Sequence, residues 1–161
     1  MADKPLYVTT LNEELDIGAM LSEGGIHAKI FLGVQGNDIE AAKLALENTI
    51  FNKLDKEENI KVLTVRMFDI LKQDNAEFFS GVSEIELITE DFRWFVNIVL
   101  RYGPSAVEII EPDEVKLGLA EMHSIIADSA DFSHMYSQQI IDMFKDPERK
   151  ALYDKMISEQ N

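Results

Sequence analysis

The sequence contains no cysteine. This absence excludes disulfide bonds, cysteine-ligated zinc or iron–sulfur sites and cysteine nucleophiles, and it removes the usual reason to place a chain outside the cell. Basic residues are also scarce, since 15 Lys and Arg stand against 30 Asp and Glu, for a formal net charge of -15. Because so acidic a surface repels polyanions and the lysines are scattered, we predict no direct nucleic-acid partner.

Long apolar runs and the common catalytic motifs are missing as well. No run reaches the roughly 18 apolar residues that a membrane helix needs. Met1 to Gly25 has no basic segment followed by an apolar core. The sequence has no G-x-S-x-G elbow, HExxH pair, P-loop or dinucleotide fingerprint. We therefore predict a cytoplasmic protein without a membrane partner, and we expect no catalytic residue and no cofactor.

The first half of the chain carries a strand pattern and then a helix pattern. With 161 residues and 46% hydrophobic content, the chain is able to bury one substantial core. Apolar side chains alternate from Ile26 to Val34, which predicts a half-buried strand. They then recur every three or four residues from Ile39 to Leu54, which predicts a helix over about 38–55 on one face of a sheet.

Two further strands, a helix and a last strand follow. Branched residues from Ile60 to Leu71 and alternation from Val82 to Ile88 predict the two strands. An amphipathic helix capped by Thr89 ends at Tyr102-Gly103-Pro104 and leads into an apolar strand, Ala106 to Ile110. The order strand, helix, strand, strand, helix, strand is the ferredoxin-like split βαβ arrangement. We therefore predict an α+β fold with one antiparallel sheet over residues 26–112.

Extensions flank this predicted domain on both sides. In residues 1–25, Leu6 to Thr10 predicts an edge strand and Asn12 to Leu21 a short helix.

In the C-terminal extension, residues 113–161, a long helix is expected to open at Pro112 and run towards Phe144. We expect a bend or break at Ser129 to Asp131, because its two apolar stripes do not align. Asp146-Pro147 predicts a last short helix. Because this extension is rich in Met, Phe and Ile, we expect it to pack on the domain or on a second subunit. We also expect the protein to self-associate as a homo-oligomer, since exposed apolar patches of this size are usually used as contacts.

The run from Asp91 to Tyr136 combines a tryptophan-containing helix, a glycine turn, an apolar strand, a Glu-Pro pair and a further helix ending near a tyrosine. In this it resembles the C-terminal extension of WYL-domain transcriptional regulators. The matching positions are Trp94, Leu100, Gly103, Val107 to Ile109, Glu111, Pro112, Val115 and Tyr136. The resemblance implies a ferredoxin-like accessory fold that senses a ligand or forms oligomers. The chain has no helix-turn-helix N-terminus of adequate length and no Trp-Tyr-Leu tripeptide. The resemblance therefore implies the accessory fold used alone, without direct DNA contact, and no functional residue is carried over.

The face of the sheet opposite the core carries the candidate ligand site. His27, Lys29 and Phe31 alternate onto that face of the first strand, and Arg66 lies on a neighbouring strand. Together they predict an anion-accommodating patch on an otherwise acidic protein. The alternative is that these residues simply face solvent or the C-terminal helices.

A second, metal-binding hypothesis concerns the long C-terminal helix. Asp131 and His134 have the i, i+3 spacing that puts a carboxylate and an imidazole on one helical face, and His123 lies earlier on the same helix. The alternative is a row of ordinary exposed polar residues. Glu84 and Glu86 likewise offer either a cation site or solvated charges that oppose sheet aggregation.

The sequence thus predicts a regulatory or ligand-sensing interaction module that self-associates and binds a protein partner or a small anionic ligand. Two alternatives stay open. One is a small-metabolite enzyme whose site forms between subunits, and the other is a structural subunit of a larger assembly.

Overall fold

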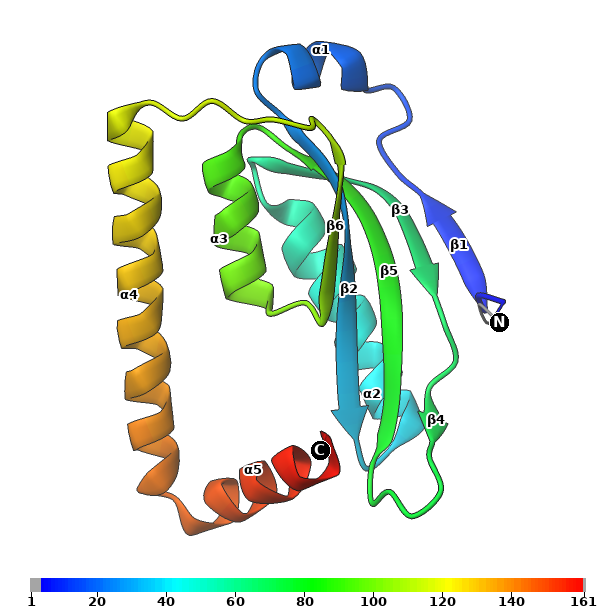
Figure 1. The fold of residues 1–161 in the computed structure, drawn as a ribbon. Coiled ribbons are helices and arrows are strands. Elements are labelled where there is room, and N and C mark those ends of the chain that lie inside the picture. Colours follow the sequence, from blue (N-terminus) through cyan, green and yellow to red (C-terminus); the bar gives the residue numbers. More distant parts are fainter. Residues whose placement is uncertain (1–3, 161) are drawn as a thin grey trace.

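The computed structural model describes residues 4–160 and confirms the α+β class. The strands are Tyr7–Thr10 (β1), Ile26–Gly36 (β2), Ile60–Met67 (β3), Leu71–Lys72 (β4), Phe79–Thr89 (β5) and Ala106–Glu111 (β6). The helices are Ile17–Ser22 (α1), Ile39–Glu47 (α2), Phe92–Tyr102 (α3), Leu119–Phe144 (α4) and Pro147–Gln160 (α5). Figure 1 shows one twisted sheet, with α2 behind its strands and with α4 standing beside it as a long arm.

The sheet has the ferredoxin-like split βαβ topology. Its strands are antiparallel in the order β1-β3-β5-β2-β6, and β4 pairs with β5. Within this order β5 is inserted between β2 and β3, which are joined through α2. β1 adds the predicted N-terminal edge strand, with Tyr7 opposite Met67. The predicted order of elements is therefore confirmed.

Two strand bounds differ from the prediction by more than two residues. β3 ends at Met67 instead of Leu71, because Leu71 and Lys72 form the separate strand β4. β5 begins at Phe79 instead of Val82, because β2 continues to Gly36 and pairs with it. The serine and glycine of this segment favour a loop locally, and the backbone pairing with β2 overrides that preference.

The helix predicted over residues 38–55 is present, but only its first part is a regular α-helix. Asp38 caps α2 by accepting a hydrogen bond from the Ala41 backbone N–H at 2.7 Å. The chain then continues as a π-helical segment, Asn48–Lys53, and a 3-10 turn, Leu54–Lys56. Its buried residues recur every four positions, a period between those of the α-helix and the wider π-turn. The stripe consists of Ala42, Leu46, Ile50 and Leu54. The wider turn keeps its later members, Ile50 and Leu54, packed against the sheet.

α3 begins and ends at side-chain and glycine signals. Its cap is Asp91, which accepts a hydrogen bond from the Trp94 backbone N–H at 2.9 Å. The predicted cap, Thr89, is instead fully buried and donates its hydroxyl to the Asp91 carbonyl at 2.8 Å. The helix ends at Gly103, whose φ of 55° lies in the left-handed region that glycine tolerates best.

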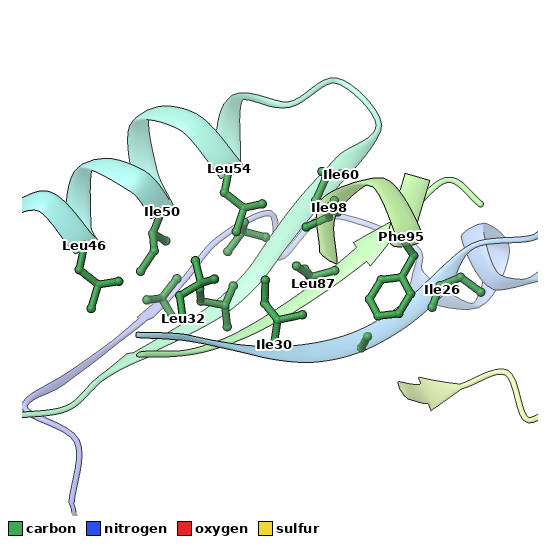
Figure 2. Packing of buried hydrophobic residues seen from close by; sticks show 14 of the residues in the cluster. Ile26, Ile30, Leu32, Leu46, Ile50, Leu54, Ile60, Leu87, Phe95 and Ile98 are labelled. Atoms are coloured by element: carbon green, nitrogen blue, oxygen red, sulfur yellow. The ribbon is translucent and has the colours of Figure 1, made fainter. Parts of the chain in front are cut away.

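The core lies between the sheet and the two helices on its covered face. Figure 2 shows Leu46, Ile50 and Leu54 facing Leu32 and Ile30 on β2. Phe95 and Ile98 of α3 complete the cluster beside Ile26 and Leu87. Burying each of these large side chains contributes about 1.5–3 kcal/mol relative to leaving it exposed.

The C-terminal arm departs from the sequence prediction at two places. The long helix does not open at Pro112, because β6 continues to Glu111 opposite His27 and α4 begins only at Leu119. α4 is also continuous to Phe144, so the predicted bend at Ser129 to Asp131 is wrong. Ser129 instead donates its hydroxyl to the Ile125 carbonyl at 2.8 Å, which satisfies this polar group inside the helix. The last helix, α5, begins at Pro147 as predicted.

Candidate functional site

The open face of the sheet carries the predicted ligand-site residues. Side chains alternate along β2, so Ile26, Ala28, Ile30 and Leu32 enter the core while His27, Lys29 and Phe31 take the opposite face, only partly buried. Arg66 on β3 lies opposite Glu84 on β5, which places it on the same face. The structure therefore brings the predicted residues to one surface.

Two carboxylates of the central strand β5 pair with the side chains of His27, Lys29 and Arg66. Glu84 Oε1 accepts from Arg66 Nη1 at 2.5 Å and lies 3.5 Å from Lys29 Nζ. Glu86 Oε1 lies 2.8 Å from His27 Nε2. Glu84 is therefore a bridge between the flanking strands β2 and β3.

This pairing changes the chemistry that the sequence predicted for the face. Lys29 and Arg66 were expected to form an anion-accommodating patch, but both lie against one carboxylate that is only 16% exposed. An anionic ligand has to compete with Glu84 for these cations. The alternation along β5 already placed Glu84 and Glu86 on one side, but only the register with both neighbouring strands shows which side chains they meet.

A hollow of about 860 Å³ adjoins this ion-paired cluster. Phe31 and Glu84 belong to its wall, so it is continuous with the predicted site. Its other apolar walls come from Phe68, Leu71 and Val82, with Lys4 and Asp69 also lining it. Apolar walls with a few charged groups suit a small organic molecule. The sequence does not point to Phe68 and Leu71 as site residues, because the branched pattern from Ile60 to Leu71 predicts one continuous strand, whereas the chain leaves β3 after Met67.

The three residues of the metal hypothesis lie on α4. His123, Asp131 and His134 are all exposed there. Within residues 4–160 the structure groups no three His, Asp or Glu side chains in a way that suits a metal ion. The metal hypothesis therefore gains no support from the arrangement.

Two tyrosines tie separate elements of the fold together. Tyr7 on β1 donates its hydroxyl to Glu47 at 2.7 Å, and Tyr102 at the end of α3 donates to Glu57 at 2.8 Å. Partial burial, and then the hydrogen bond and charge of the accepting carboxylate, raise the pKa of each tyrosine to about 12. Each phenol is held in its neutral, donating form and links two elements, so we assign both tyrosines a structural role.

These features define an α+β protein of the ferredoxin-like arrangement, with an ion-paired open sheet face and a helical C-terminal arm. The chain belongs to the MJ0538 family, whose model matches residues 27–157, from the first core strand through most of α5. None of the helices within residues 4–160 combines the length and apolarity that crossing a membrane requires.

A curated relative from Methanocaldococcus jannaschii carries the name "Uncharacterized protein MJ0538". It is 31% identical over 94 residues, which cover 58% of this chain and 35% of the relative. The chain thus matches about a third of the length of that relative. No solved structure matches this chain.

Proposed function

We propose that this protein is a cytoplasmic, self-associating interaction module with a regulatory role, and that its C-terminal arm forms the contact surface. The observation that carries the proposal is the run of exposed apolar side chains from β6 through α4. They are Val107, Ile109, Ile110, Val115, Leu119, Met122, Ile126, Met135, Tyr136, Ile140, Ile141 and Phe144. Exposed apolar groups gathered in this way are typical of protein–protein contact sites.

The edge strand β6 supports the same proposal. All six of its residues are exposed, and Val107 and Ile109 project from the core side of the sheet at 41% and 45% exposure. A free edge strand offers unpaired backbone groups to another chain. An exposed apolar edge strand beside an exposed apolar helix is therefore better suited to contact with another chain than to solvent.

Native mass spectrometry over a micromolar concentration series tests this proposal. We expect an oligomer, and we expect Ile126→Lys on α4 to weaken it at least tenfold because a charge replaces an apolar contact. Leu44→Lys on α2 is the matched control, since Leu44 and Ile126 are both 67% exposed. A wild-type chain that stays monomeric throughout the series would contradict the proposal.

A second candidate function is small-molecule sensing at the hollow beside Glu84. Its support is the combination of an 860 Å³ hollow with aromatic and charged walls. The resemblance of residues 91–136 to WYL-domain regulators implies the same role. We expect an aromatic sulfonate such as anilinonaphthalene sulfonate to bind several-fold more weakly to Phe31→Ser than to wild type. Ile126→Lys is the control for dye that binds to the C-terminal arm. An equal loss of dye affinity in Phe31→Ser and Ile126→Lys would contradict a binding site at the hollow.

The two alternatives predicted from sequence remain proposals of lower rank. A site between subunits would use His27, Lys29 and Arg66, and a purely structural subunit would use none of them. Replacing Lys29 and Arg66 by alanine separates these two, because only the first predicts loss of ligand with assembly unchanged.

A further inference from the structure

We infer that α4 packs antiparallel against α4 of a second copy of this chain, about a two-fold axis that passes at the level of Asp131. The inference rests on the proposed self-association and names its partner and geometry. It concerns one uncharged stripe of α4 and does not require the open face of the sheet.

The stripe follows a near-regular spacing of three and four residues along the helix. Its members are Leu119, Met122, Ile126, Ser129, Ser133, Tyr136, Ile140 and Phe144. Because α4 is continuous and has about 3.6 residues per turn, this spacing puts them on one side of the helix, as in the seam of a coiled coil. The large members are 37–67% exposed, so the seam has no full partner within residues 4–160.

The body of the protein uses mostly a different side of the same helix, although the hydroxyl of Tyr136 in the stripe lies 4.0 Å from where a Cβ on Gly103 would stand. Asp128 points to α3, where it accepts hydrogen bonds from Arg93 and Asn97. In Figure 1, α4 runs beside α3 and then extends well beyond its end. Docking on α3 and pairing with another helix are therefore compatible.

The stripe is nearly symmetric about Asp131, and this symmetry selects a second copy as the occupant. Met122 and Ile140 are each nine residues from Asp131, Ile126 and Tyr136 are each five, and Ser129 and Ser133 are each two. Reversing the helix direction therefore reproduces the same order of large and small side chains. In an antiparallel pair, large residues meet large ones and serines meet at the centre, where small side chains allow close approach.

The placement of charge on α4 is compatible with a second copy as the occupant. The stripe itself is uncharged, while the acidic residues of α4 lie outside it; they are Glu121, Asp128, Asp131 and Asp142. α4 contains no Lys or Arg. A partner is therefore recognised on this stripe by apolar shape, and two such stripes meet without facing their carboxylates towards one another.

The size of the contact predicts a reversible dimer. A helix of this length spans about 39 Å, and pairing two of them buries roughly 1,000 Å² in total, near the lower limit for a specific interface. We therefore expect dissociation in the micromolar range, with additional contacts from β6 strengthening it.

Disulfide mapping tests the geometry directly, because the natural chain has no cysteine. Ser129→Cys and Ser133→Cys proteins are made separately, mixed in equal amounts and oxidised mildly. We expect the mixture to form a disulfide between position 129 of one copy and position 133 of the other, in at least fivefold excess over either protein alone. Asp131→Cys is the register-matched control, since it lies at the same level on a different side of α4 and is expected to stay unlinked.

Each remaining outcome overturns the inference in a different way. Efficient linking of each single variant with itself, and no gain on mixing, indicates a parallel pair. Linking of Asp131→Cys indicates that the other side of the helix is used. A native dimer that forms no disulfide in the mixture rejects the α4 pairing but leaves self-association intact, whereas a native monomer rejects the proposed function itself.

Discussion

The guanidinium of Arg93 on α3 holds the carboxylate of Asp128 on α4 through two parallel hydrogen bonds, 2.7 Å from Nε and 3.0 Å from Nη2. Asn97 on α3 donates a third at 2.8 Å. The hydrogen bonds from Arg93, and then the one from Asn97, hold the pKa of Asp128 below its usual range. This contact fixes the side of α4 that faces the body and thereby the side that stays exposed.

We expect Asp128→Ala to loosen α4 from α3. The variant leaves Arg93 and Asn97 without this acceptor, so amide hydrogen exchange within residues 119–144 is expected to accelerate at least tenfold. Asp131→Ala is the matched control on the same helix. Equal acceleration in both variants would show that the Arg93 contact does not hold the arm.

The same carboxylate predicts a pH dependence with a defined sign. Because the pKa of Asp128 is lowered in the fold, its contribution to stability is full above the ordinary carboxyl pKa of about 4 and is lost as the pH falls below that value. The fluorescence of Trp94, the single tryptophan, which lies next to Arg93 on α3, is expected to change over this acid range. Asp128→Asn removes the titrating group, and a transition that persists unchanged in it would contradict the assignment.

The two tyrosines predict a loss of stability at high pH. Since folding raises the pKa of Tyr7 and of Tyr102 to about 12, their contributions are full below about pH 10 and are lost as the pH rises from about 10 to 12. Each Tyr→Phe change is expected to cost about 0.5–1 kcal/mol at neutral pH, at the low end for a hydrogen bond because both sites are partly solvated. Ultraviolet titration and urea unfolding measure both effects. Tyr153→Phe on the exposed α5 is the control, and two fully normal titrations at Tyr7 and Tyr102 would refute the contacts.

Gly25 is expected to be sensitive to the smallest enlargement. A Cβ at this position would lie 2.8 Å from the Met20 carbonyl oxygen and 2.9 Å from that of Thr89, and both are backbone atoms. Gly25→Ala should therefore destabilise the protein by about 1–3 kcal/mol in urea unfolding. Gly118→Ala is the control, since nothing lies within 4 Å of its added methyl group. Equal stability of the two variants would mean that the close approach at Gly25 relaxes freely.

Glu84→Gln is expected to expose the anion site that the sequence predicted. The change removes the negative charge between Lys29 and Arg66, so inorganic phosphate should bind at low salt at least tenfold more tightly than to wild type. Isothermal titration calorimetry measures the difference. Glu86→Gln, which alters only the pair with His27, is the control. No gain in Glu84→Gln would mean that the two cations do not converge on an anion.

Local patterns in the sequence were sufficient for the order of elements. Alternation from Ile26 to Val34 and the helical spacing from Ile39 to Leu54 depend on neighbouring residues alone. The strand was therefore predicted correctly, and the helix was predicted correctly as far as Glu47, where the regular α-helix ends. Pro112 was misassigned because a proline suits a strand end as well as a helix start. The strand pairing of Glu111 with His27, which is remote in sequence, decided between them.

The candidate site, too, was determined partly by the sequence and partly by the tertiary structure. Alternation by itself determined that His27, Lys29 and Phe31 share the open face, because side chains of a strand point to opposite sides in turn. Only the tertiary structure decided that Glu84 bridges Lys29 and Arg66, since this depends on the register of β5 against two other strands. Likewise, the apolar content of α4 was plain from the sequence. The contact between Arg93 and Asp128, made by residues far apart in the chain, decided which side of that helix is left open.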